Sequence, residues 1–184
     1  MRLLVSLVLC AVVMSSPALA AASSPTGRNL RPQDDRLTKL LHAGSARSAT
    51  LKSLVDRIEA SRVIVYVEIN PMMKPNLSGM LTWMTQAGRY RYLRASISHD
   101  LTPDQMIATI AHELQHAVEV IEDEAVNDEN SLVTLYRRIG QQSGNTSPSR
   151  WETDAAQRTG FPVRKELASV PVTTIARAGA AGRS

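Results

Sequence analysis

The segment from Thr102 to Ile121 constrains the fold more than any other part of the chain, because it carries the signals of a buried amphipathic helix. Thr102-Pro103-Asp104-Gln105 has the order of an N-terminal capping box with proline at the first helical position. Apolar side chains then recur at three- and four-residue spacing, which predicts one core-facing side. These residues are Ile107, Ile110, Ala111, Leu114, Val118 and Ile121.

The same segment contains His112-Glu113-Leu114-Gln115-His116, an HExxH motif. Two histidines four residues apart lie on one face of a helix and can bind one zinc ion at about 2.0–2.1 Å. Zinc polarises a water molecule, and Glu113 can take the proton of that water. The motif indicates metal-dependent hydrolysis, most often of a peptide bond. The plain alternative is a pair of surface histidines on an amphipathic helix.

Residues 1–20 have the composition of a secretory signal peptide. Arg2 precedes an apolar run from Leu3 to Met14, and Ala18-Leu19-Ala20 provides a cleavage site. The run is too short to span a membrane. We therefore expect a secreted or periplasmic protein with no stable membrane span after cleavage, and an uncleaved anchor is the alternative.

The rest of the chain has the size of one domain. Composition predicts a linker over 21–35, a single domain over 36–176 and a flexible tail over 177–184. The formal net charge is only +4, and the basic residues are dispersed along the chain. Because no basic block with interleaved aromatic residues occurs, nucleic acid is not an expected partner.

Periodicity predicts an α+β fold, in which a small antiparallel or mixed sheet packs on the motif helix and the helices that follow it. The helices expected beside the motif helix are 37–41, 46–60, 129–139 and 151–158, with Gly44, Gly140 and Gly160 as stop signals. The expected strands are a central strand over 62–69 and a hairpin over 81–86 and 89–98. Arginines in the second hairpin strand indicate an edge position or a solvent-facing side, and 141–149 has the composition of a polar loop.

A catalytic zinc site needs a third protein ligand and one position left for water. The single cysteine, Cys10, falls in the expected signal peptide, so the third ligand must be a histidine or a carboxylate. Glu119 and Glu122 stand where the metzincin motif requires glycine and histidine, and the inverted order H-x-x-E-H is absent. The scheme that remains is two histidines and a glutamate from a later helix.

At the HExxH motif, and more weakly at Trp151-Glu152-Thr153-Asp154-Ala155-Ala156, the chain resembles the gluzincin-type metalloproteases. It is also similar to small secreted bacterial proteins of unassigned function that carry both motifs. The resemblance implies a zincin-like catalytic domain with Glu152 as the third zinc ligand, on a helix that small residues allow close to the motif helix. Asp154, Glu119 and Glu124 are rival ligands, and Asp154 can instead hydrogen-bond a ligating histidine.

Together these patterns predict a secreted zinc endopeptidase that acts on a peptide or protein substrate. Tyr136, His99 and Arg158 are candidate donors to the oxyanion, and the strand ending at Ser98 is a candidate for pairing with an extended substrate. The alternative is a non-catalytic, zinc-stabilised envelope or interaction protein on the same fold. Glu113 argues against it, since a structural zinc site needs no base.

Overall fold

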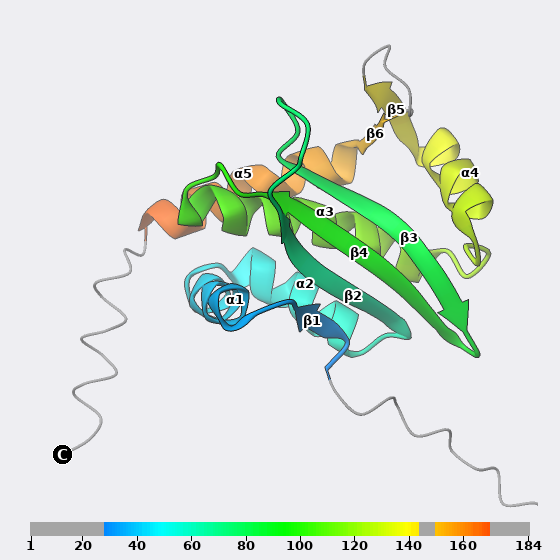
Figure 1. Ribbon diagram of the computed structural model, residues 1–184, viewed down its shortest axis with the longest axis horizontal. Coiled ribbons are helices and arrows are strands. Elements are labelled where there is room, and N and C mark those ends of the chain that lie inside the picture. Colours follow the sequence, from blue (N-terminus) through cyan, green and yellow to red (C-terminus); the bar gives the residue numbers. More distant parts are fainter. Residues whose placement is uncertain (1–27, 144–149, 170–184) are drawn as a thin grey trace, which may run out of the picture.

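The computed structural model describes residues 28–143 and 150–169, which form an α+β fold as expected (Figure 1). The strands are β1 (Leu30–Pro32), β2 (Val63–Asn70), β3 (Gly79–Ala87), β4 (Tyr90–Ser98), β5 (Gly140–Ser143) and β6 (Arg150–Thr153). The helices are α1 (Asp35–Arg47), α2 (Ala49–Glu59), α3 (Pro103–Glu122), α4 (Glu129–Ile139) and α5 (Asp154–Ser169). The expected signal peptide, 1–20, and the expected tail, 177–184, lie outside the described residues. No helix in the described part of the chain is long and apolar enough to cross a membrane.

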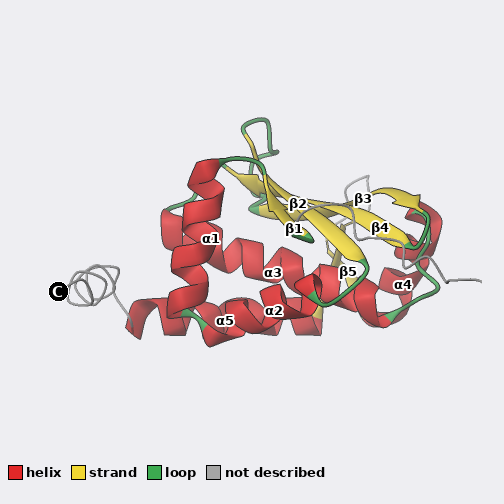
Figure 2. Ribbon diagram, turned by 90° about the horizontal axis from the view of Figure 1, so that it is seen from below, coloured by secondary structure: helices red, strands yellow, loops and turns green. Residues whose placement is uncertain are grey.

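The main sheet is mixed and has the strand order β1-β2-β4-β3. β2 pairs in parallel with β1 and β4, and β3 and β4 form an antiparallel hairpin whose register shifts between Trp83 and Thr85. The helices lie on one side of this sheet, as Figure 2 shows. β2 is central, as predicted, and β3 is the edge strand next to β4. β5 and β6 form a separate two-stranded antiparallel sheet.

The expectation was an edge or a solvent face, and the edge is wrong, because β4 pairs with both β2 and β3. Arg94 is exposed, in agreement with a solvent face, whereas Arg91 serves a contact within the fold. Arg91 Nη1 donates to the carbonyls of Val120 and Asp123 at 2.8 and 2.7 Å, and so binds the C-terminal end of α3. Cations are favourable there, since the last carbonyls of a helix carry partial negative charge. Arg94, on the same strand, lies 3.6 Å from Glu68 of β2.

α3 is the central helix of the domain and contacts β2, β3, β4, α2 and α5. Its predicted capping box is confirmed: Gln105 N donates to Thr102 Oγ1, and Thr102 N donates to the side chain of Gln105 at 2.9 Å. The apolar stripe faces the core, where Ile110 and Leu114 are completely buried. The Arg47 guanidinium, from the end of α1, binds Asp104 at 2.7 Å in the first turn of α3. Both ends of the motif helix are thus held by arginines from other elements.

Two expectations for the N-terminal part are wrong. The last part of the expected linker, 21–35, is folded, because β1 pairs with β2 and α1 begins at Asp35. The first helix also continues through Gly44 to Arg47 instead of stopping before the glycine. A Cβ atom at Gly44 would lie 2.9 Å from both Ile107 Cγ2 and Leu51 Cδ2. Glycine at this position allows α1 to approach α2 and α3 closely.

The region after α4 also differs from its prediction. α4 ends at Ile139 before Gly140, as expected, but the expected loop over 141–149 begins with β5. The expected helix over 151–158 is wrong in both boundaries, because Arg150–Thr153 is β6 and α5 runs from Asp154 through Gly160 to Ser169. α5 then packs along α3 (Figure 1). Trp151 and Glu152 therefore lie on a strand that leads into this helix.

Candidate metal centre

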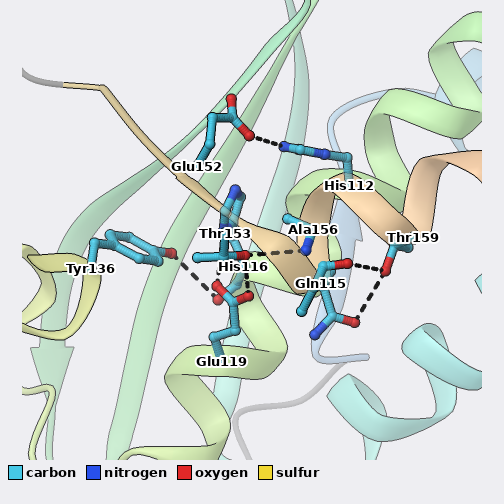
Figure 3. A network of polar contacts seen from close by, with 10 residues as sticks. His112, Gln115, His116, Glu119, Tyr136, Glu152, Thr153, Ala156 and Thr159 are labelled. Atoms are coloured by element: carbon cyan, nitrogen blue, oxygen red, sulfur yellow. Dashed lines mark hydrogen bonds and ion pairs between the residues drawn. The ribbon is translucent and has the colours of Figure 1, made fainter. Parts of the chain in front are cut away.

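Three side chains that could hold a metal ion converge at the junction of α3 and β6. His112 and His116 lie one turn apart on α3, and Glu152 reaches them from β6 (Figure 3). One ligand atom from each of the three residues lies within 4.8 Å of the others. His112 Nε2 and Glu152 Oε2 are 3.1 Å apart, about the separation of two ligands on one zinc ion with bonds near 2 Å. The structure thus brings the three expected ligands together, but Glu152 comes from a strand and not from the expected helix.

A buried polar chain fixes the orientation of His116. His116 Nδ1 lies 2.9 Å from Glu119 Oε2, and the Thr153 hydroxyl donates to Glu119 Oε1. A carboxylate only accepts, so Nδ1 carries the proton, and Nε2 is the nitrogen with a lone pair for a metal. Thr153 Oγ1 also accepts from Ala156 N at 3.1 Å, in the first turn of α5. Thr153 therefore links β6, α3 and α5 directly behind the ligand set.

Glu119 thus positions a ligand and is not the third ligand, since both of its oxygens face His116 and Thr153. The sequence contained a signal for this role that the motif-based interpretation missed. Residues three apart on a helix are neighbours, and Glu119 follows His116 by that spacing. Thr153 could not be found in the same way, because its contact with Glu119 depends on how β6 docks on α3.

The electrostatics of the site favour a cation between the ligands. Burial lowers the pKa of His112, but a hydrogen bond to Glu152, the negative charges of Glu113 and Glu152, and a hydrogen bond to the Ala156 backbone outweigh it. The net result is a His112 pKa above its usual value, so positive charge is stabilised at this position. Two imidazoles and one carboxylate could hold a metal ion, and catalytic zinc centres are among the sites that use this donor set. The residues therefore fit zinc, although they do not select it over other divalent metals that imidazole and carboxylate bind.

Glu113 lies beside the ligand set and against the start of β3. The residue is only 4% exposed. A Cβ atom at Gly79 would lie 2.5 Å from Glu113 Oε1 and 2.7 Å from Thr109 Cγ2. Because real Cβ atoms do not approach other atoms so closely, glycine at position 79 is what allows β3 to pass over this carboxylate.

Two cavities of about 240 Å³ each meet at the candidate centre and share Gly79, His112, Glu113 and Glu152 in their walls. The first, which we call the apolar cavity, lies between β3, α4 and β6. Its other walls include Leu77, Leu81, Trp83, Leu132, Val133, Tyr136 and Trp151. The second, which we call the polar cavity, lies between the start of β3 and α5. Its other walls include Asn76, Ser78, Gln157 and Arg164. A larger hollow of about 730 Å³, between α1, α2 and β1, shares no residue with the centre.

Of the three expected oxyanion donors, Tyr136 is at the site. Its ring lies edge-on to His116 at a centroid distance of 5.3 Å, and its hydroxyl is 3.5 Å from the carbonyl oxygen of His116. Burial, together with the charges of Glu119 and Glu113, raises the pKa of Tyr136 well above its usual value, so the phenol stays protonated.

The other candidates from the sequence lie elsewhere. His99 pairs with Asp100 at 2.9 Å in the turn before α3, and Arg158 lies 3.7 Å from Asp154 on the exposed face of α5. Asp154 is therefore neither a ligand nor a partner of a ligating histidine in this structure, and the expectation of such a role is wrong. Glu124 is exposed in the turn after α3 and does not belong to the ligand group.

Comparison of the chain with protein-family models, with curated proteins and with solved structures finds no match in any of the three. The similarity to gluzincin-type proteases is therefore a similarity of two short motifs. What the protein does must be inferred from the side chains of the centre and from the cavities around it.

Proposed function

We propose that the protein is a zinc-dependent peptidase in which His112, His116 and Glu152 hold the metal and Glu113 is the general base. The observation that supports this proposal most is the convergence of the three ligand side chains from α3 and β6. A coincidental HExxH motif on an amphipathic helix would not require a carboxylate from another element next to its histidines. A purely structural zinc site would not require Glu113.

The chemistry follows from the positions of the side chains. His112, His116 and Glu152 would hold the zinc ion, which would supply Lewis acidity toward a water molecule and a peptide carbonyl. The Glu113 carboxylate accepts the proton of the water as the water oxygen attacks the carbonyl carbon. Glu113 then delivers the proton to the leaving amine as the C–N bond breaks. The protonated hydroxyl of Tyr136 lies near the centre, but it donates to the His116 carbonyl oxygen and would have to leave this partner to donate to the negative oxygen of the substrate.

The edge of the main sheet provides a place for an extended substrate. Among the described residues, β3 pairs with β4 on one side, and residues of its first half line the apolar cavity. An extended peptide can add to such an edge by main-chain hydrogen bonds. The strand expected for this role, which ends at Ser98, is β4 and pairs on both sides. We therefore assign substrate pairing to β3.

The test compares the wild type with Glu113→Gln on a mixed peptide library, with bound zinc measured in each preparation. Glutamine has nearly the same shape but cannot accept the proton, so we expect hydrolysis to fall by about 10²–10⁴-fold while zinc binding is retained. Glu122→Gln is the matched control, because this exposed glutamate near the end of α3 pairs with Arg57 and belongs to neither cavity.

Equal cleavage by the wild type and Glu113→Gln would reject Glu113 as the base. A wild type that binds zinc but cleaves no peptide would favour the alternative, a non-catalytic zinc-stabilised protein. Loss of cleavage in a chelator and its return on addition of zinc would tie the activity to the metal.

A further inference from the structure

The two cavities at the centre offer different surroundings to the two sides of a bound substrate. The apolar cavity presents the aromatic side chains of Trp83 and Trp151. The polar cavity presents the amides of Asn76 and Gln157 and the guanidinium of Arg164. Amide and guanidinium groups donate hydrogen bonds, and guanidinium adds a positive charge. The Glu113 and Glu152 carboxylates line the same cavity but form no ion pair with Arg164. An anionic group therefore fits this cavity next to the guanidinium, away from the two carboxylates.

Gly160, one turn earlier in α5, leaves room for the Arg164 guanidinium beside the polar cavity. A Cβ atom at Gly160 would lie 3.3 Å from Arg164 Nη1 and 3.6 Å from Nη2. The guanidinium therefore folds back over the glycine, in the direction that helical side chains take. Gly160 lines the same cavity, and the absence of a side chain there leaves the room that the guanidinium uses.

Arg164 forms no ion pair with a carboxylate in the described part of the chain. No Asp or Glu oxygen of residues 28–143 and 150–169 lies within 4.0 Å of the Arg164 guanidinium. Other arginines of the fold, such as Arg47 and Arg138, bind carboxylates at 2.7 and 2.6 Å. An arginine without such a pair, in the wall of a cavity that reaches Glu113 and Glu152, is available to a ligand.

We infer that Arg164 binds a carboxylate of the substrate, so that the proposed peptidase selects peptides with a negative charge close to the scissile bond. The inference rests on the proposed function for the position of that bond. Guanidinium binds carboxylate through two parallel hydrogen bonds. Gln157 lies seven residues before Arg164, on the same face of α5, and its amide adds a further donor. The carboxylate belongs either to the C-terminus of a peptide or to an Asp or Glu side chain.

Binding to the Glu113→Gln variant tests this inference without hydrolysis. The probes are fluorescein-labelled random pentapeptides as free acids and as amides, and amidated pentapeptides with Glu or Gln fixed at one position. Fluorescence anisotropy with the zinc-loaded variant gives the affinity for each probe. In one of the two comparisons, free acid against amide or Glu against Gln, we expect the peptide with the carboxylate to bind about 10- to 100-fold more tightly than its neutral counterpart. Tighter binding of the free acids identifies the C-terminus, and tighter binding of the Glu peptides identifies a side chain.

Adding Arg164→Gln should abolish this preference, and adding Arg164→Lys should restore only part of it, because lysine lacks the planar fork. Lys165→Gln is the matched control, since this neighbouring exposed cation lines neither cavity and its loss changes the net charge equally. Equal affinities within both peptide pairs, no binding of any probe, or a preference that survives Arg164→Gln would overturn the inference.

Hydrolysis of the same peptides by the wild type separates this inference from the proposed function. Cleavage without any preference for a carboxylate would reject the role of Arg164 and leave the peptidase standing. Binding that depends on the carboxylate and on Arg164, with no cleavage by the zinc-loaded wild type, would support the binding site and reject the peptidase.

Discussion

α3 and β6 hold the candidate metal centre in different ways. α3 is a helix of 20 residues in the middle of the domain, and the side chain of its ligand His116 is only 6% exposed. β6 is a strand of four residues in a two-stranded sheet, and the side chain of its ligand Glu152 is 23% exposed. His116 is therefore buried in the core, whereas His112, at 22%, is as exposed as Glu152. The contrast lies in the elements: two candidate ligands stand on the long central helix, and the third stands on a small peripheral strand. The position of Glu152 should be the more sensitive to change.

The largest effect is expected from removal of the ligands themselves. His116→Ala and Glu152→Ala should each weaken zinc binding by more than about 100-fold, above the range for residues that only hold a ligand in place. In the metal-free protein His116→Ala should be the more destabilising, by about 1–3 kcal/mol, because it leaves the buried Glu119 without its imidazole partner, whereas Glu152→Ala removes a contact with the more exposed His112. Chelator competition gives the affinities, and urea unfolding of the metal-free variants gives the stabilities. Equal destabilisation by both variants would contradict the contrast between α3 and β6.

The next largest effect is expected at Thr153, which links β6 to α3. Thr153→Val removes the hydroxyl that donates to Glu119 and caps α5, and should weaken zinc binding by about 10- to 100-fold. Thr153→Ser keeps the hydroxyl and should restore most of the affinity. If the valine variant loses stability but binds zinc as tightly as the wild type, Thr153 only supports the fold.

A smaller effect is expected from crowding the peripheral sheet. A Cβ atom at Gly140 would lie 2.9 Å from the backbone oxygens of both Glu152 and Tyr136, so Gly140→Ala must shift β5 or β6. We expect a loss of about 1–2 kcal/mol in unfolding free energy, the usual cost of overpacking, and a loss of less than about 10-fold in zinc affinity. Gln141→Ala, at an exposed position of the same strand, is the control. An unchanged affinity together with the stability loss would show that Glu152 tolerates movement of β6.

The smallest effect on stability is expected from Asp104→Asn, at the N-terminal end of α3. The hydrogen bond from Arg47 holds the pKa of Asp104 below its usual value, so the folded state binds this proton less readily than the unfolded state. The contribution of Asp104 to stability is therefore present above its unfolded pKa and is lost as the pH falls through the lower, folded pKa. Because half of the Asp104 side chain is exposed, Asp104→Asn should cost less than about 1 kcal/mol at neutral pH.

Denaturant unfolding of Asp104→Asn and the wild type from pH 7 to pH 3 should show a difference that shrinks toward acid. Zinc affinity at neutral pH should not change. A change in affinity as large as that of Thr153→Val would show that the N-terminal end of α3 is coupled to the metal centre.

The same contrast explains how far the sequence predicted the structure. The signals for α3 lie within the helix itself: a capping box at Thr102 and a stripe of apolar residues. The four residues of β6 are too few for a periodic pattern, and they form a strand because β5 lies beside them. Glu152 was expected as a ligand because the segment around it resembles a family motif. That this segment forms a strand was not expected. The hydroxyl of Thr153 was a local sign that α5 starts at Asp154.

The remaining errors share one physical cause, which is that tertiary contacts outweigh local preference. Gly44 and Gly160 were expected to end helices, yet each lies inside one, where its missing side chain makes room for Ile107 or for Arg164. Arg91 was expected to mark an edge or a solvent-facing side, but it binds the carbonyls at the end of α3. For Gly44 and Arg91 the partner lies far away in the sequence, whereas Arg164 follows Gly160 by one turn of the same helix.

The bulge in β3 has a consequence for self-association. An open edge strand is a template for pairing with another copy of the same chain, which leads to aggregation. The register shift between Trp83 and Thr85 interrupts the ladder and increases the local twist, so a long flat edge is not presented. Residues 79–83 remain as a short straight run beside Glu113. That length suits one extended peptide, but it gives a second copy of the sheet too few main-chain bonds to continue into a stack.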